Sequence, residues 1–310
     1  MAVNDNIRNA LESYGGFSIN TRVYNYLGSL GYTGTISDRL AKYSYEDKKG
    51  WQALIARYAG GLSELLQLQQ LLFGNGEQGL LFVPEPGLEG EDVLYQDAAG
   101  TTLADANGDP VGRGDEFSGN NNSLTQSVSA DRPLYQTDGS LHWVEGDGAG
   151  DHLVVPWVQD ASSSQSMSFA VEQVESNQFR YVFGANSDEG VNAIVNSGVL
   201  RAFVTTTAGG GIALEGSTIS SGQPFIYTVT WDRSSGDLRI YLNGVLDASK
   251  TTPVADLVPA SNHALLNRGP SGSQHYKAKV YGGAASNWLW DEATRESVEA
   301  YLAKLVGRTL

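Results

Sequence analysis

The stretch of residues 225–248 constrains the fold most, because it encodes three antiparallel strands in succession. Apolar side chains occupy every second position in residues 225–232 and 238–242 and so share one face of each strand: Phe225, Tyr227, Val229, Trp231, Leu238, Ile240 and Leu242. Asn243-Gly244 follows, a pair that accepts the positive φ of a two-residue hairpin turn. A meander with one apolar face needs a second sheet to cover it, so the sequence predicts a β-sandwich.

Short alternating runs elsewhere supply the other strands. They lie between residues 167 and 214 and again in 264–281, separated by turn residues about every 8–12 positions. We expect these runs to contribute most of the core: Trp143, Phe169, Val171, Tyr181, Phe183, Phe203, Val229, Trp231, Ile240 and Leu242. Trp157 and Trp288 are interpreted either as core residues or as an exposed platform for glycans. A helix over 291–306, capped by Asp291, is predicted to pack on the sandwich.

The first 75 residues are predicted to form a separate helical module. Apolar residues recur at spacings of three and four in segments 6–14, 18–30, 51–58 and 64–73, the pattern of short amphipathic helices. The last segment opens at Ser63. Its leucines support two hypotheses, a helix that covers its own domain's core or a short seam for self-association.

Charge and composition exclude several classes of protein. The net charge of the 310 residues is −15, and residues 76–160 hold 2 Lys or Arg against 16 Asp or Glu, which argues against a nucleic-acid surface there. No apolar run of about 18 residues predicts a membrane span, and residues 1–6 lack the pattern of a secretory signal. Without Cys the chain has no disulfide or thiolate metal site, and we expect synthesis in a reducing cytoplasm.

Several motifs between residues 95 and 151 resemble those of a known family: Tyr95–Leu103, Gly108–Gly112, Ser118–Asn121, Ser129–Tyr135, Thr137–Gly139 and Asp147–Asp151. Together they resemble the concanavalin A-like (laminin-G-like) jelly-roll domains of tailed-bacteriophage virion structural proteins. The resemblance extends over about residues 76–306. The predicted fold class is therefore α+β. A small N-terminal helical module over residues 1–75 precedes an antiparallel β-sandwich, a jelly roll, over 76–310 with a closing C-terminal helix.

Jelly rolls also host glycoside hydrolases, so the carboxylates of this chain are candidate catalytic groups. Those enzymes hold two carboxylates on either side of the sugar bond. The nearest pattern is Glu145 and Asp147, but Gly150 stands where a third carboxylate is expected. The four histidines at positions 142, 152, 263 and 275 lack the spacing of metalloprotease ligands, and no nucleophile-elbow motif occurs. We therefore expect no enzymatic activity.

One acidic segment has the spacing of a calcium loop. Asp105, Asn107 and Asp109 lead to Glu116 at the twelfth position, as oxygen ligands do in such loops. Pro110, however, replaces the glycine of the sixth position. Two interpretations stay open, a calcium site and an ordinary acidic loop, and Asp147 with Asp151 forms a second candidate. Calcium is the one cofactor that the sequence suggests.

The resemblance implies a structural protein of a phage virion, located in the particle as a capsid decoration, head fibre, or tail or fibre component. Its expected partners are other virion proteins, further copies of itself (a trimer suits the leucine seam) and a host surface glycan, with no nucleic acid and no membrane span. The alternative hypothesis is a carbohydrate-binding or host-receptor adhesin module. A polysaccharide hydrolase is a third.

Overall fold

The computed structural model describes residues 44–45, 48–49, 63–175, 178–186, 189–260 and 262–310. The chain forms two compact units, Met1–Gln67 and Leu68–Leu310. In the first unit β1 (Ser44–Tyr45) pairs antiparallel with β2 (Lys48–Lys49). The helices expected before residue 63 lie outside the described residues, and the domain boundary expected at residue 75 stays a prediction.

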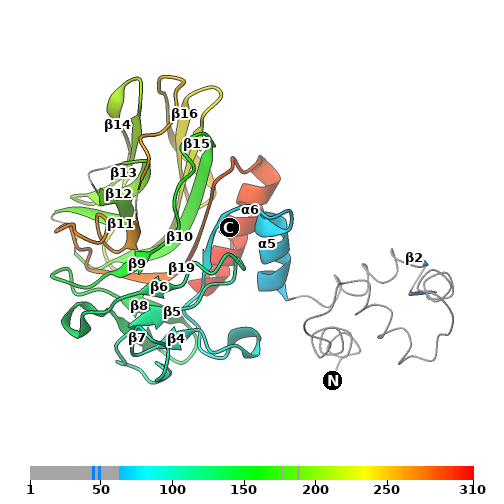
Figure 1. Ribbon diagram of the computed structural model, residues 1–310, viewed down its shortest axis with the longest axis vertical. Helices are drawn as coiled ribbons and strands as arrows, with labels where there is room; N and C mark the ends of the chain where they lie inside the picture. Colours follow the sequence, from blue (N-terminus) through cyan, green and yellow to red (C-terminus); the bar gives the residue numbers. More distant parts are fainter. Residues whose placement is uncertain (1–43, 46–47, 50–62, 176–177, 187–188, 261) are drawn as a thin grey trace. The chain divides into compact units, whose positions relative to one another are not determined.

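The second unit is an antiparallel β-sandwich (Figure 1). In spatial order the first sheet consists of β17 (Val245–Thr251), β16 (Asp237–Leu242), β15 (Pro224–Asp232), β10 (Gln165–Gln173), β19 (Ala278–Ser286), β8 (His142–Glu145) and β7 (Leu134–Thr137), and β3 (Gly79–Phe82) also pairs with β19. The second sheet consists of β14 (Gly210–Thr218), β13 (Val199–Thr206), β12 (Val191–Asn196), β11 (Phe179–Ala185), β18 (His263–Leu265), β9 (Leu153–Val155), β6 (Leu124–Thr125), β5 (Arg113–Gly114) and β4 (Leu94–Tyr95).

The predicted meander is present as β15, β16 and β17. Val229 pairs with Ile240 and Trp231 with Leu238, so the apolar faces of the two strands coincide. Asn243 and Gly244 both have positive φ, 49° and 83°, as the two-residue turn requires. The sequence prediction of this hairpin is confirmed.

The core lies between the two sheets and contains most of the residues expected there. Trp231, Tyr227 and Phe169 are among its largest fully buried side chains, and Trp157 is also buried, at 3% exposed. Two expectations are wrong. Trp143 and Phe203 are only half-buried because their neighbours, Val144 and residues 202 and 204, occupy the inward positions of β8 and β13. In an alternating strand the second apolar set must face outward.

Two helices belong to the described part of the chain. They are α5 (Glu64–Phe73) and α6 (Glu292–Leu305). Ser63 Oγ accepts a hydrogen bond from the Leu66 N–H, 3.2 Å away, and Asp291 caps α6, as predicted. The α6 helix packs on β10, β15 and β19, which places it on the outer face of the first sheet. The α+β class with a closing helix is therefore confirmed. Neither described helix combines the length and apolar composition that a membrane crossing requires.

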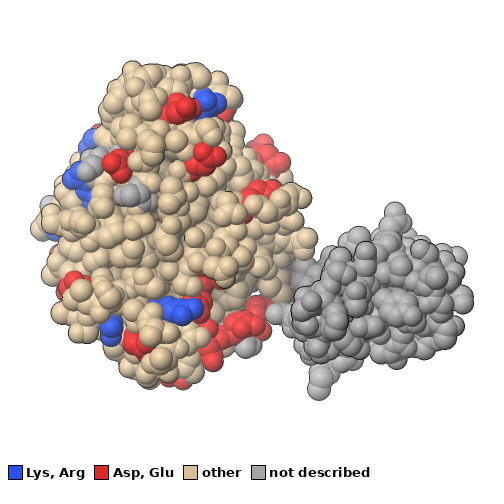
Figure 2. Space-filling view, viewed as in Figure 1, with Lys and Arg blue, Asp and Glu red and all other residues tan. Residues whose placement is uncertain are grey.

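Short connections fill the acidic part of the sequence. Besides β3 to β9 it contains two 3-10 turns, η1 (Leu88–Gly90) and η2 (Ser129–Asp131). In the view of Figure 2, acidic side chains gather along the lower edge of the molecule, over the region where Figure 1 labels β4, β5 and β7. Part of the negative charge of residues 76–160 thus lies on the surface around these short strands.

Candidate functional site

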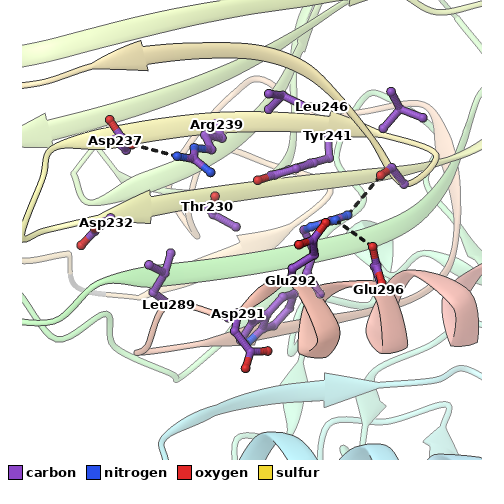
Figure 3. Close-up of a pocket in the computed structure, with 14 residues that line it drawn as sticks. Thr230, Asp232, Asp237, Arg239, Tyr241, Leu246, Leu289, Asp291, Glu292 and Glu296 are labelled. Atoms are coloured by element: carbon purple, nitrogen blue, oxygen red, sulfur yellow. Dashed lines mark hydrogen bonds and ion pairs between the residues drawn. The ribbon is translucent and has the colours of Figure 1, made fainter.

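A groove with a volume of about 640 Å³ lies on the outer face of the first sheet. Strands β15 to β17 form one wall, and the start of α6 with the segment before it forms the other (Figure 3). A volume of this size falls in the range of roughly 300–1,000 Å³ that small-molecule sites occupy. The groove is therefore the candidate functional site.

The residues of the strand wall are the outward-facing members of the same alternating sequence whose inward-facing members form the core. Leu238, Ile240 and Leu242 face inward, so the intervening residues of β16 must face outward. These are Asp237, Arg239 and Tyr241, and all three line the groove. On β15 the partner of Arg239 is Thr230 and the partner of Asp237 is Asp232, both of which also line it. One ladder of cross-strand pairs thus presents a row of polar groups beside a tyrosine ring.

The helical wall is built by one face of α6. Glu292, Arg295 and Glu296 recur at spacings of three and four and so share that face. Asp291 Oδ1 accepts a hydrogen bond from the Thr294 N–H at 2.8 Å, which fixes the start of the helix. Just before it, the Trp290 side chain is locked by a 2.7 Å hydrogen bond from its Nε1–H to the Ser286 hydroxyl. The groove therefore has a rigid second wall.

A buried ion pair within α6 holds the arginine that contacts both walls. Arg295, 6% exposed, pairs with Glu299, 1% exposed, and donates to the Gly244 carbonyl oxygen at 3.2 Å. The Arg295 guanidinium also lies over the Tyr241 ring, 4.2 Å from its centre. Burial raises the pKa of Glu299, opposed by a hydrogen bond with Thr228 and by the positive charge of Arg295. These contacts hold one face of the tyrosine ring against the helix.

Hydrogen bonds shift the pKa values of the ionisable groups along the strand wall. The Tyr241 hydroxyl and then the Asp237 carboxylate, 2.9 Å away, raise the pKa of Arg239. Burial acts to raise the pKa of Asp232, but hydrogen bonds from Ser235 and Ser234 outweigh it and lower that pKa. Both groups therefore stay ionised at neutral pH.

Apolar side chains border these polar groups. Leu246 is 51% exposed and Leu289 is 38% exposed, and they lie on the strand wall and the helical wall (Figure 3). An aromatic ring, apolar borders and side chains that both donate and accept hydrogen bonds suit a ligand that is itself amphipathic and rich in hydroxyl groups.

Three of the four candidate calcium ligands accept hydrogen bonds from backbone N–H groups in this structure. Asp109 Oδ2 accepts from the Ala106 N–H at 2.9 Å, and Asn107 Oδ1 accepts from the Thr137 N–H at 2.8 Å. The two Glu116 oxygens accept from residues 118 and 122, while Asp105 is exposed. Across the described residues no three His, Asp or Glu side chains are arranged to hold a metal ion. Calcium binding at these four residues stays a prediction.

The carboxylates considered for hydrolysis also have structural contacts. Glu145 accepts a 3.0 Å hydrogen bond from the Trp143 indole. Asp147 Oδ1 accepts from the N–H groups of residues 149, 150 and 151 and so closes a glycine-rich loop. Of the four histidines, His263 is buried in the core and its pKa falls to about 4 because of desolvation. His152 and His275 lie near each other, with ring centres 5.5 Å apart.

The sequence motifs do not point to the groove. They predict the β16–β17 hairpin only as part of the sheet, whereas it supplies Arg239, Tyr241 and Leu246 to the site. The alternating sequence of β16 does predict that Asp237, Arg239 and Tyr241 face outward. Every strand with one exposed face has such a set of residues, however, so the pattern does not mark a site. Its partner residues on α6 lie about 50 positions later, so no local spacing marks them.

Comparison with known proteins agrees with this architecture. Residues 147–282 match the family model of the concanavalin A-like lectin/glucanases superfamily. The binding domain of botulinum neurotoxin serotype D superposes with a TM-score of 0.51 at 11% sequence identity, over 76% of this chain and 52% of that chain. Within the sandwich, residues 147–282 thus resemble the concanavalin A-like lectins and glucanases.

A second solved structure resembles this jelly roll more weakly. The binding domain of Paraclostridial Mosquitocidal Protein 1 gives a TM-score of 0.49 at 15% identity, over 61% of this chain and 49% of that chain. The chain thus spans about half the length of the solved structures it matches. No curated protein matches the sequence significantly.

Proposed function

We propose that this protein is a carbohydrate-binding module whose jelly roll holds a glycan in the groove between β15–β17 and α6. The observation that carries the proposal is the Tyr241 ring, fixed by Arg295 at 4.2 Å and flanked on β16 by Arg239 and Asp237. A pyranose ring has an apolar C–H surface that stacks on an aromatic ring. Its hydroxyl groups pair with guanidinium and carboxylate groups beside that ring.

A screen on a glycan array, followed by calorimetry with the best ligand, tests this proposal. We expect Tyr241→Ala to weaken binding about tenfold or more, equivalent to about 1.4 kcal/mol. Tyr95→Ala is the matched control, since Arg113 lies over the Tyr95 ring at 5.6 Å, in another part of the sandwich. Equal losses for both variants, or an array without any ligand, would overturn the proposal.

Tyr241→Phe distinguishes the contribution of the aromatic ring to binding from that of its hydroxyl group. The variant keeps the stacking surface but loses the hydrogen bond to Arg239. We expect it to retain most of the affinity. A folded Tyr241→Ala variant, shown by a cooperative thermal transition, is required for the comparison. Incorporation into a bacteriophage particle, the role implied by the sequence motifs, stays a separate prediction.

A further inference from the structure

The groove carries more negative than positive charge. Five carboxylates line it, those of Asp232, Asp237, Asp291, Glu292 and Glu296, against the two guanidinium groups of Arg239 and Arg295. They come from both walls of the groove (Figure 3). A concave surface lined by one sign of charge concentrates the opposite charge.

Both guanidinium groups are already paired. Arg239 donates to Asp237 at 2.9 Å. Arg295 is 6% exposed and is paired with Glu299, a carboxylate that does not itself line the groove. Glu299 is 1% exposed. The buried pair therefore leaves no positive charge at the inner end of the groove for an anionic ligand.

The carboxylates of α6 are compensated only in part. Glu296 forms an ion pair with Arg295, 3.6 Å from its Nη2, but shares that guanidinium with Glu299, and the Glu296 side chain is 61% exposed. Glu292 lies one turn earlier on the same face and is exposed. Asp291 and Asp232 accept hydrogen bonds from neutral donors, which leave their charges in place. The charge that faces the ligand is consequently negative on balance, with five carboxylates against two guanidinium groups.

We propose that the groove selects glycans that carry free ammonium groups, that is, chains of deacetylated hexosamines. This inference rests on the proposed function, since it assumes that Tyr241 stacks on a sugar ring. The apolar and aromatic surfaces bind the pyranose rings, and Glu292 and Glu296 pair with the ammonium groups. Sugars that bear carboxylates are repelled by the same residues.

The test compares two oligosaccharides that differ only in acetylation. Binding of the full-length protein to a glucosamine tetramer and to the N-acetylglucosamine tetramer is measured by calorimetry at about pH 6, where carboxylates are ionised and amines carry charge. We expect the glucosamine tetramer to bind about tenfold more tightly, and the difference to shrink as salt screens the charges. A galacturonate tetramer is expected to bind more weakly than either.

Two double variants distinguish binding to the carboxylates of the groove from general attraction to the net charge of −15. Glu292→Gln with Glu296→Gln should reduce binding of the glucosamine tetramer to the level of the acetylated one. The control, Glu175→Gln with Glu215→Gln, changes the net charge equally at two exposed residues outside the groove. An equal effect of both pairs would show non-specific attraction and overturn the inference.

The outcomes also distinguish the inference from the proposed function. If both tetramers bind equally and Tyr241→Ala weakens both, the charge selectivity is wrong and the proposed function stands. If none of the oligosaccharides binds and the array is also negative, the proposed function fails, and the inference fails with it. Tighter binding of the galacturonate tetramer would overturn the inference alone.

Discussion

At the scale of single residues, Asp151 shows how burial changes protonation. The side chain is 6% exposed, and Oδ2 accepts a hydrogen bond from the Asp147 N–H at 3.0 Å. Burial, followed by the negative charge of Asp147, raises the pKa of Asp151 to about 7. The folded chain therefore keeps a proton that the unfolded chain releases near pH 4.

We expect Asp151→Asn to alter the pH dependence of stability. Because the pKa is raised on folding, the contribution of Asp151 is fully present below about pH 4 and is lost as pH rises through about 7. Asn keeps an oxygen acceptor for the Asp147 N–H and does not titrate. Between about pH 5 and pH 8 the melting temperature of the variant should therefore rise relative to that of the wild type.

Asp97→Asn is the control for this measurement. Hydrogen bonds, chiefly from the Thr101 hydroxyl, lower the pKa of Asp97. Its contribution is therefore lost only at acidic pH, below the range measured, and its effect on the melting temperature should be constant between about pH 5 and pH 8. A constant effect of Asp151→Asn over that range would contradict the raised pKa.

At the scale of secondary-structure elements, the Arg295–Glu299 pair connects α6 to the β16–β17 hairpin. Arg295 donates to the carbonyl of Gly244 in the hairpin turn and stacks on Tyr241 of β16. Both members of the pair are buried, so neither charge is well solvated without the other.

Removal of one partner should therefore cost much more than removal of both. Arg295→Ala leaves the Glu299 carboxylate buried alone, and we expect a loss of about 3–5 kcal/mol in the free energy of unfolding. The double substitution Arg295→Met with Glu299→Leu should recover most of that loss. Urea denaturation measures both values, and a double variant less stable than Arg295→Ala would contradict this account.

The elements were predictable where the signal is local, and the groove was not. The Asn243-Gly244 turn, the apolar alternation of β15 and the Asp291 cap each lie within a few residues of the structure they specify. For Trp143 and Val144 the sequence offers two apolar neighbours on β8, and only the second sheet decides which of them faces inward. The groove likewise depends on packing, because α6 must lie beside β16 before Tyr241 and Arg295 can meet.

At the scale of the whole molecule, the α5 helix raises the question of where the sandwich begins. The sequence places the boundary after residue 75, whereas one of the two compact units begins at Leu68. Leu72 and Phe73, near the end of α5, are 0% and 8% exposed. The indole N–H of Trp288 donates to the Leu72 carbonyl at 3.2 Å. The last turns of α5 thus contact the segment that leads into α6.

Two fragments decide whether α5 is part of the folded sandwich. We expect residues 63–310 to unfold cooperatively at the melting temperature of the sandwich in the full chain, and to bind glycans equally well, because the whole groove lies within them. Residues 76–310 lack α5 and expose the surface that Leu72 and Phe73 cover. Burial of each such side chain contributes about 1.5–3 kcal/mol, so calorimetry should show a lower melting temperature for the shorter fragment. Equal melting temperatures would instead place the boundary at residue 75, with α5 belonging to the preceding module.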